Sequence, residues 1–462
     1  MHIFATIKFI GPASLYVLGI IAFLMGVAGK GQTTLLLVAF LLPLRNIIEK
    51  IQAFPLGTQF IDILLLGVIL GGIFHKMSVD STRDKSGIST IGIIAVLYLL
   101  FSLLRSSLYL YHNISFDIHD SRVQDWKNFG LLPLLFFLVF HNNTDKKQVW
   151  TTFAVMCAAM FLADYYTARQ IGLHSGLGSR EQIKGTFEFL GPNEVAAFFN
   201  EYTIILMSVF YAIKGRNKWL LGILITANLY CITFLYSRGA YAGLMMGMLI
   251  LFGFKDKKWW IPLLLVLALW QTVLPQNVVD RIKETKTATG QLDESSQRRI
   301  DIWHQGMDYF KANPIEGIGF GTFRNLGLDL NDTHNIYIKI LTEQGLVGFI
   351  IFLIILACFL RQGWMLYQKG DDEMSRSMGL GFVCCLFVLM VNNFFGDRWS
   401  YLEPNSYLWI FAGLVTRLNA IAQNTKDVAP QVEIVTPVFT AKPQYNASKP
   451  RKTRYYDPSP LN

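Results

Sequence analysis

Apolar runs of close to twenty residues recur along the whole chain, and short polar links separate them. A helix of about twenty apolar residues crosses the hydrocarbon core of a bilayer. The chain is 52% hydrophobic and 16% charged, whereas a soluble domain carries about 25% charged residues. The pattern therefore predicts an all-α polytopic integral membrane protein with about twelve or thirteen transmembrane helices. The expected spans are 9–29, 32–48, 60–76, 88–104, 129–141, 149–166, 194–213, 219–236, 239–254, 259–275, 334–360, 377–395 and 403–418.

Positive charge is distributed unevenly among the links. Basic residues gather in the links 75–85, 145–147, 214–218, 255–258 and 361–376. Positively charged loops stay on the cytoplasmic side of a membrane, and these five links alternate consistently with the expected spans. The alternation places 105–128, 167–193 and the long polar stretch 276–333 on the outside. Membrane topology thus accounts for the formal net charge of +9, and we expect no nucleic-acid partner.

Four regions follow from this topology. Residues 1–275 are expected to form the N-terminal transmembrane helices, 276–333 a long periplasmic loop and 334–418 the C-terminal transmembrane helices. The remainder, 419–462, is rich in proline, lacks apolar periodicity and ends in a basic cluster, which predicts a disordered cytoplasmic tail. Gly67-xxx-Gly71 and Gly243-xxx-Gly247 permit close helix packing, although chance matches are expected in a chain with 37 glycines.

The external loop is long for a connection without a function, and it contains a helical pattern. An apolar face recurs at helical spacing in Ile300, Trp303, Met307 and Phe310. We expect a short amphipathic helix from about Ser295 to Phe310 that lies against the membrane surface or the mouth of the bundle. Arg298 and Arg299 fall in its first turn, where cations oppose the helix dipole. Either they bind an anion held at the helix start, or they belong to a solvated polar face.

Nothing in the sequence calls for a cofactor. Gly317-Ile-Gly319-Phe-Gly321 has glycines at a spacing seen in phosphate-binding loops, but no strand precedes it. We expect it instead to form a tight turn that returns the loop to the membrane. No acidic cluster suited to a metal ion and no cytoplasmic nucleotide motif are present in the sequence.

His334 opens the apolar run that follows the loop, and Gly345 falls on the same face if the helix is continuous. A helix N-terminus disfavours an imidazolium, so we expect His334 to be neutral and able to act as a general base. The alternative is an interfacial histidine with a structural hydrogen bond. His304, on the amphipathic helix, is the second candidate among the histidines.

Basic residues gather at the outer ends of the expected spans. Arg238 follows Ser237 between two apolar runs, where a charge is costly and is typically functional, with snorkelling to the headgroups as the alternative. Further candidates for substrate binding on this side are Arg180, Lys184, Asn193, Asn335 and Arg398. For Arg398 the alternative is a pair with a nearby carboxylate. Because guanidinium groups bind phosphate oxygens bidentately, a basic pocket beside a neutral histidine suits a diphosphate-lipid substrate.

These residues, in this order, resemble the O-antigen ligase superfamily, which includes O-antigen ligases and repeat-unit polymerases of bacterial envelopes. The resemblance covers about residues 180–360 of the chain. It rests on Gly185-Thr-Phe187, Pro192-Asn193, Ser237-Arg238-Gly239, Arg299-xxx-Trp303, Asn313-Pro314-Ile-x-Gly317-x-Gly319 and His334-Asn335 followed by Gly345. The motifs do not separate the members of the superfamily.

The resemblance implies glycan transfer without a metal or a nucleotide, at the periplasmic face of the bacterial inner membrane. The donor would be a glycan on undecaprenyl diphosphate, held by Arg238 with Arg298 or Arg299. His334 would position or deprotonate the acceptor hydroxyl. The acceptor would be lipid A–core in a ligase, which is our leading hypothesis, or a second lipid-linked glycan in a polymerase of O-antigen or exopolysaccharide. A transporter of polysaccharide or lipid-linked solutes is the rival of another class.

Overall fold

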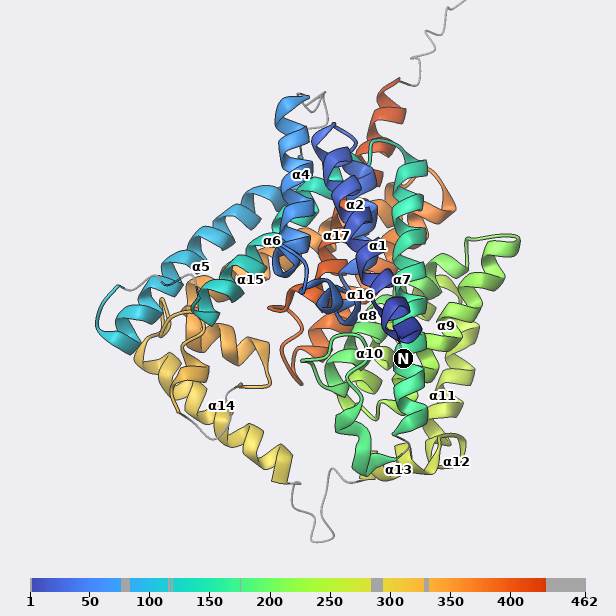
Figure 1. The fold of residues 1–462 in the computed structure, drawn as a ribbon. Coiled ribbons are helices and arrows are strands. Elements are labelled where there is room, and N and C mark those ends of the chain that lie inside the picture. The colour runs from blue at the N-terminus through green and yellow to red at the C-terminus, as the bar shows by residue number, and fades with distance from the viewer. Residues whose placement is uncertain are drawn as a thin grey trace, which may run out of the picture.

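Helices build the molecule, which is known from a computed structural model that describes residues 2–75, 84–114, 117, 119–174, 176–283, 294–327 and 332–428. No strand occurs among these residues. Most of the helices run side by side in a bundle, and α14 (Glu294–Ala312) lies obliquely below α5 and α15 (Figure 1). The predicted all-α membrane class is therefore confirmed.

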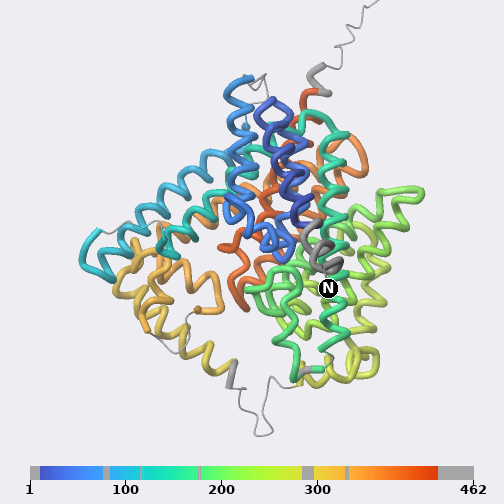
Figure 2. Tube along the Cα trace, in the orientation of Figure 1, coloured from blue at the N-terminus to red at the C-terminus, as the bar shows by residue number. Residues whose placement is uncertain are grey.

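Every expected span coincides with a helical segment. These segments are α1 (His2–Val27), α2 (Gly31–Leu41), α4 (Phe60–Phe74), α5 (Ile88–Tyr111), α6 (Ser121–Asn142), α7 (Lys146–Leu173), α8 (Pro192–Phe210), α9 (Arg216–Phe234), α10 (Arg238–Lys255), α11 (Trp260–Ala268) with α12 (Trp270–Val273), α15 (Ile336–Lys369), α16 (Glu373–Asn392) and α17 (Leu402–Val428). The tube in Figure 2 shows that helices far apart in the sequence, such as α5 and α15, lie side by side.

The structure corrects the length of several spans. Five helical segments of the described chain are long and apolar enough to cross a membrane: Gly57–Phe74, Ile88–Tyr111, Lys146–Leu173, Ile336–Lys369 and Glu373–Asn392. The expected span 32–48 is only the 11-residue α2 followed by the short α3 (Arg45–Ile48), and 259–275 is divided between α11 and α12. At the other end of the chain, α17 continues to Val428. Residues 429–462, which hold most of the expected tail, lie outside the described residues.

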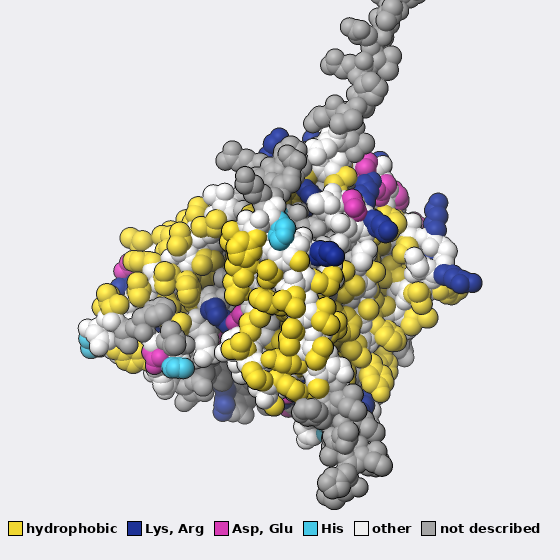
Figure 3. All heavy atoms as spheres, turned by 45° about the horizontal axis from the view of Figure 1, so that its top comes forward, with side chains coloured by type: hydrophobic (Ala, Val, Ile, Leu, Met, Phe, Trp, Pro, Cys, Tyr) yellow, Lys and Arg dark blue, Asp and Glu magenta, His cyan; other side chains and the backbone are white. Residues whose placement is uncertain are grey.

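Links that the charge pattern assigns to one side of the membrane meet at one end of the bundle. Lys146 lies 2.6 Å from carboxylate oxygens of both Asp371 and Asp372. Lys255 pairs with Glu373 at 2.7 Å. Figure 3 shows a broad hydrophobic surface whose visible Lys and Arg side chains cluster mainly towards its upper right edge. The packing thus brings together three of the five basic links, 145–147, 255–258 and 361–376.

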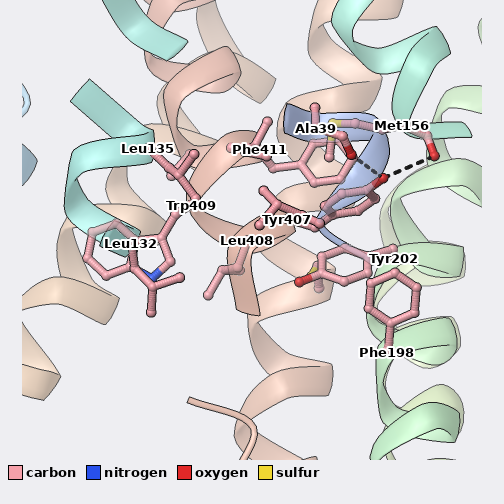
Figure 4. Close-up of a cluster of buried hydrophobic side chains, with 14 of the residues drawn as sticks. Ala39, Leu132, Leu135, Met156, Phe198, Tyr202, Tyr407, Leu408, Trp409 and Phe411 are labelled. Atoms are coloured by element: carbon pink, nitrogen blue, oxygen red, sulfur yellow. Dashed lines mark hydrogen bonds between the residues drawn. The ribbon is translucent and has the colours of Figure 1, made fainter. Parts of the chain in front are cut away.

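The core at the centre of the bundle is aromatic, and two of its buried tyrosine hydroxyls are hydrogen-bonded. The Tyr407 hydroxyl donates to the carbonyl oxygen of Ala39 at 2.9 Å, and that of Met156 lies at 3.4 Å (Figure 4). Tyr202 packs beside Tyr407, with ring centroids 5.5 Å apart, and donates to the carbonyl of Pro404. A hydroxyl buried without a partner would be costly, so these bonds fix how α2, α7, α8 and α17 meet.

Both small-residue motifs mark close helix contacts, where chance matches were the expectation. A Cβ atom on Gly71 would lie 1.9 Å from the carbonyl oxygen of Gly26, so α4 approaches the backbone of α1 directly. A Cβ atom on Gly247 would lie 2.6 Å from a methyl carbon of Val388. This second contact draws α10 against α16, two helices that build the site described below.

The helix that follows the loop is broken, which corrects the expectation of a continuous helix. Gly345 has φ 64° and ψ −164° inside α15 and divides it into 336–344 and 346–369. The glycine-rich stretch fills the break. The amides of Ile318 and Gly319 donate to the carbonyls of Thr342 and Glu343, and the amide of Leu346 donates to the carbonyl of Pro314. The stretch that was expected to form a tight turn instead hydrogen-bonds to the backbone groups that the break in α15 leaves without partners.

The amphipathic helix predicted in the loop is confirmed as α14, and Ala312 ends it before Asn313-Pro314. It packs on the first segment of α15 at the mouth of the bundle. Thr342 donates to the carbonyl of Gly306 at 3.0 Å, and the indole N–H of Trp303 donates to the carbonyl of Thr333 at 2.8 Å. These contacts hold the start of α14 beside the residues that precede α15.

Candidate functional site

A polar pocket of about 190 Å³ opens at the start of α10. Its lining comes from α8, α10, α13 (Gln276–Lys283), α14, α16 and the link after α16. The lining residues are Asn193, Ala197, Ser237, Arg238, Gly239, Ala240, Arg281, Ser296, Arg299, Asn392, Phe395 and Arg398. We call this the arginine pocket, because four of these side chains are arginines and none is a carboxylate.

The start of α10 forms one wall of the arginine pocket. Ser237 is the N-cap of α10, and its hydroxyl accepts from the amide of Ala240 at 3.4 Å. Arg238 is the first residue of the helix. Unpaired backbone N–H groups and the positive end of the helix dipole meet at such a terminus. Backbone and side chain therefore present positive charge to the same pocket, as anion binding requires.

A hydrogen-bond network of two buried amides and one buried carboxylate includes Asn392, which lines the pocket. The Asn392 amide donates to the side-chain oxygen of Asn200 at 2.9 Å and to the carboxylate of Glu201 at 2.8 Å. Asn200 in turn donates to the carbonyl of Ala240 at 2.7 Å. All three side chains are buried. The network ties α8, α10 and α16 together directly beneath Arg238 and fixes the geometry of the wall.

Arg398 reaches the pocket from the link between α16 and α17. Its side chain is buried, and Nη1 donates to the carboxylate of Glu194 at 2.9 Å. The pairing with a carboxylate that the sequence left as the alternative is thus confirmed, and the same residue also lines the pocket. Its Nε has no partner among the described residues. A buried, unused donor on a pocket wall is costly unless an acceptor enters.

Arg180 lies behind Asn193, outside the lining. Its Nη2 donates to the Asn193 side-chain oxygen at 2.9 Å, and Nη1 to Glu181 at 3.0 Å. Burial lowers the pKa of Arg180 below its ordinary value. The structure therefore makes Arg180 a support for Asn193, which itself faces the pocket.

The two adjacent arginines of α14, Arg298 and Arg299, have different surroundings. Arg299 lines the arginine pocket together with Ser296, whereas Arg298 is exposed and is not among the lining residues. Arg281 from α13 completes the set, although the sequence analysis did not select it. Its signal was the short pattern of α13, in which Val278 and Val279 are buried and a basic residue follows Val278 by one turn on the same side of the helix. His304 is exposed on α14.

His334 directly precedes Asn335, the residue that caps α15. The Asn335 side chain accepts from the amides of Tyr337 and Ile338, so its role here is structural. His334 has φ 49°, a left-handed conformation that costs about 1–3 kcal/mol and is typical of functional sites. Its Nδ1 lies 3.8 Å from Asp332 Oδ2, and its side chain is 37% exposed.

The surroundings of His334 favour the neutral imidazole. Burial lowers the pKa of His334 below its ordinary value, and the positive charges of Arg299 and Arg398 lower it further, while Asp332 and Glu194 act in the opposite direction. The sequence analysis expected a neutral histidine because of the helix N-terminus. In the structure, burial is the largest cause. Two arginines of the pocket, Arg299 and Arg398, influence the imidazole, although His334 is not among the lining residues.

The sequence-predicted residues therefore fall into two groups. The structure gathers Arg238, Arg299, Arg398 and Asn193 around one pocket with His334 beside it. Lys184 lies apart from it, and its backbone amide donates to the Gln170 side chain at 2.9 Å. Arg298, Arg180 and Asn335 do not line the pocket either.

Comparison with known proteins bears on the segment that carries most of this site. No curated protein matches the chain. A family model described as O-antigen ligase matches residues 219–353, which include Arg238, Arg299 and His334. The match agrees with the resemblance inferred from the motifs, and this segment is similar to O-antigen ligases.

Proposed function

We propose that the protein transfers a glycan from undecaprenyl diphosphate to an acceptor hydroxyl at the periplasmic face of the inner membrane, as an O-antigen ligase does. The family match supports glycan transfer from a lipid carrier in general. The observation that carries the specific proposal is the arginine pocket together with a neutral histidine that two of its arginines influence.

The chemistry of the pocket suits a diphosphate. Arg238, Arg299 and Arg398 converge with Arg281 on about 190 Å³, with the start of α10 as a further positive wall. Planar guanidinium groups match phosphate oxygens and keep their charge at any physiological pH. The described lining contains no carboxylate that would repel an anion or hold a metal ion. The pocket therefore neutralises two phosphates through its own side chains.

The reaction is a displacement at the anomeric carbon of the donor glycan. His334 takes the proton of the acceptor hydroxyl, and the oxygen forms a bond to the anomeric carbon. The bond between that carbon and the diphosphate oxygen breaks, and its electron pair leaves with undecaprenyl diphosphate. Negative charge grows on the leaving oxygen in the transition state. The arginines, positioned before the reaction, stabilise this charge.

Complementation of a deletion strain tests the proposal. His334→Ala and Arg238→Ala should each abolish surface polysaccharide and cause the lipid-linked glycan to accumulate, while the variants reach the membrane in normal amounts. Arg361→Ala, in the second segment of α15 and outside the arginine pocket, serves as the matched control and should restore the polysaccharide. Surface polysaccharide of wild-type amount and length from both site variants would refute the proposal.

The same deletion strain distinguishes a ligase from a polymerase. Loss of a ligase leaves polymerised glycan on its lipid carrier, because only the final transfer is blocked. Loss of a polymerase leaves single repeat units on the carrier. We propose the ligase outcome, with lipid A–core as the acceptor. Single repeat units in the extracted lipid would instead assign the polymerase activity.

A transporter is the rival function, and two buried carboxylates favour it. Asp164 in α7 and Glu201 in α8 are both almost fully buried inside helices, and intramembrane charges commonly mark substrate pathways. Glu201, however, accepts from Asn392 in the network beneath the arginine pocket, where a structural role is evident. Purified protein in liposomes decides between the two. Movement of the lipid-linked glycan without formation of a glycosidic bond would favour the transporter.

A further inference from the structure

A second polar pocket has Asp332, a neighbour of His334, in its wall. It has a volume of about 70 Å³. Its lining consists of Asp125, Phe320, Gly321, Phe323, Arg324, Asp332, Lys339, Glu343, Ser400 and Tyr401. We call it the Glu343 pocket. Asp332 belongs to its wall and also approaches His334 Nδ1, whereas Arg299 and Arg398, which act on the same imidazole, belong to the arginine pocket. His334 is therefore close to Asp332 of the Glu343 pocket and is influenced by two arginines of the arginine pocket.

Glu343 is the unusual residue of this pocket. Only 1% of its surface is exposed. One carboxylate oxygen, Oε1, accepts from the amide of Phe323 at 3.1 Å, but Oε2 has no partner among the described residues. A buried carboxylate oxygen without a hydrogen bond is costly. Such an atom on a pocket wall indicates that a donor from a ligand completes its bonding.

The glycine-rich stretch encloses Glu343 at the end of the first segment of α15. Glu343 is the penultimate residue of the segment 336–344, and its carbonyl accepts from the amide of Gly319 at 2.8 Å. The residues that follow Gly319 carry the amide of Phe323 to the Glu343 carboxylate. The glycine-rich stretch and the residues after it thus form part of the pocket wall.

The two cationic side chains of the Glu343 pocket already form ion pairs with carboxylates. Lys339 lies 2.7 Å from Asp397, whose other oxygen accepts from the amides of Trp399 and Ser400. Arg324 lies 2.6 Å from Asp125. With these cations paired and a free carboxylate oxygen on the wall, the pocket disfavours phosphate. It differs in this respect from the arginine pocket, which holds no carboxylate in its described lining.

Sugar hydroxyls fit the remaining groups. Hydroxyls donate hydrogen bonds, which the Glu343 oxygen lacks, and they accept them from groups such as the Tyr401 hydroxyl. Phe320 and Phe323 add apolar surface to the wall. Concave sites that combine apolar side chains with a few fixed polar groups are typical of small-molecule recognition. The volume admits one edge of a sugar ring and excludes a whole glycan.

We propose that the Glu343 pocket binds one hydroxyl-bearing edge of the acceptor sugar, with Glu343 accepting a hydrogen bond from that sugar and Tyr401 contacting it. This inference rests on the proposed function. With the diphosphate in the arginine pocket, the Glu343 pocket would hold the acceptor on the side of His334 where Asp332 lies.

Glu343→Gln tests the inference, because the amide keeps the size of the side chain and can still accept from Phe323. The full-length variant is purified in nanodiscs and supplied with lipid extract from the deletion strain, which contains both donor and acceptor. The transfer rate should fall roughly tenfold or more, as expected for a lost hydrogen bond to a charged group. The dissociation constant for undecaprenyl diphosphate, measured separately, should stay within about twofold because the arginine pocket is intact.

Two further variants make the result specific. Glu316→Gln changes a carboxylate of the same loop that pairs with Arg105 outside the pocket, and it should transfer like the wild type. Tyr401→Phe removes only one hydroxyl and should reduce transfer without weakening undecaprenyl diphosphate binding. Glu343→Gln could lower the unfolding temperature so far that its transfer rate is not informative. In that case the transfer rate of Tyr401→Phe decides whether the pocket binds the acceptor.

The outcomes separate this inference from the proposed function. Wild-type transfer by Glu343→Gln, or by Tyr401→Phe where the first variant is unstable, would overturn the acceptor site. Equal loss of transfer and of undecaprenyl diphosphate binding would also overturn it, because the pocket would then serve the donor. If His334→Ala and Arg238→Ala also kept full transfer, the proposed function itself would fail.

Discussion

The amide of Gly319 donates a 2.8 Å hydrogen bond to the carbonyl of Glu343, and this bond joins the long loop before α15 to a broken helix. A broken helix leaves carbonyls and amides without intrahelical partners. In an apolar environment each of them must be satisfied by protein. The stretch 314–319 supplies these partners, and in doing so it brings the loop and the start of α15 together around His334.

Gly345→Ala should destabilise the protein. Gly345 has φ 64°, and a Cβ atom there would lie 2.3 Å from the backbone oxygen of Ile315. We expect a loss of at least about 2 kcal/mol, because the backbone conformation is strained for any other residue and the clash adds to it. Thermal unfolding in detergent measures the effect. Gly172→Ala, with no atom within 4 Å of its Cβ, is the control, and an equal shift for both variants would contradict the prediction.

Arg299→Ala and Arg298→Ala should differ sharply. Arg299 lines the arginine pocket, whereas its neighbour Arg298 is exposed outside it. Removal of one charge-stabilising donor typically reduces a rate by about 100-fold or more. We therefore expect Arg299→Ala to accumulate lipid-linked glycan and Arg298→Ala to transfer close to the wild-type rate. Quantification of the carrier-linked glycan in complemented strains checks this. Similar transfer rates for the two variants would show that Arg299 does not bind the diphosphate.

The rate should fall at acidic pH with the titration of His334. Burial lowers the pKa of His334 below its ordinary value of 6.5. A base acts in its unprotonated form, so the rate is full above this pKa and is lost as the pH falls through it. The acid midpoint of the rate should lie below 6.5, the ordinary value.

Asp332→Asn sharpens the pH test. Asp332 raises the pKa of His334 through its negative charge, so its removal should move the acid midpoint to still lower pH. The transfer rate as a function of pH, measured on the purified wild type and variant, gives both midpoints. A midpoint above 6.5 in the wild type, or an upward shift in the variant, would exclude His334 as the titrating base.

Asp397→Asn should destabilise the mouth of the bundle. The Asp397 side chain is 1% exposed and pairs with Lys339 at 2.7 Å. Removing one partner of a buried pair typically costs about 3 kcal/mol or more, since the other charge is left uncompensated. The double variant Lys339→Met with Asp397→Asn should recover much of this loss in unfolding experiments. Asp308→Asn, which breaks the exposed pair with Lys311, should change little. Full stability of Asp397→Asn alone would refute the argument.

The sequence was sufficient for the parts of this protein that depend on local pattern. Apolar runs predicted the helices, and link charges predicted which links would meet at one end, because insertion into a bilayer depends on hydrophobicity and charge along the chain. The period of Ile300, Trp303, Met307 and Phe310 predicted α14. The cost of charge near the membrane singled out Arg238, and the expected topology added Arg398; both line the pocket.

Only the tertiary structure decided how these parts meet. The choice of Arg299 over Arg298, the entry of Arg281, and the network of Asn200 and Asn392 depend on packing between segments that are far apart in the chain. The break at Gly345 is likewise invisible in an apolar helical pattern, since it is stable only because residues 314–319 satisfy the freed backbone groups. Local pattern therefore determined which residues lie near the membrane surface, and long-range hydrogen bonding decided which of them share a pocket.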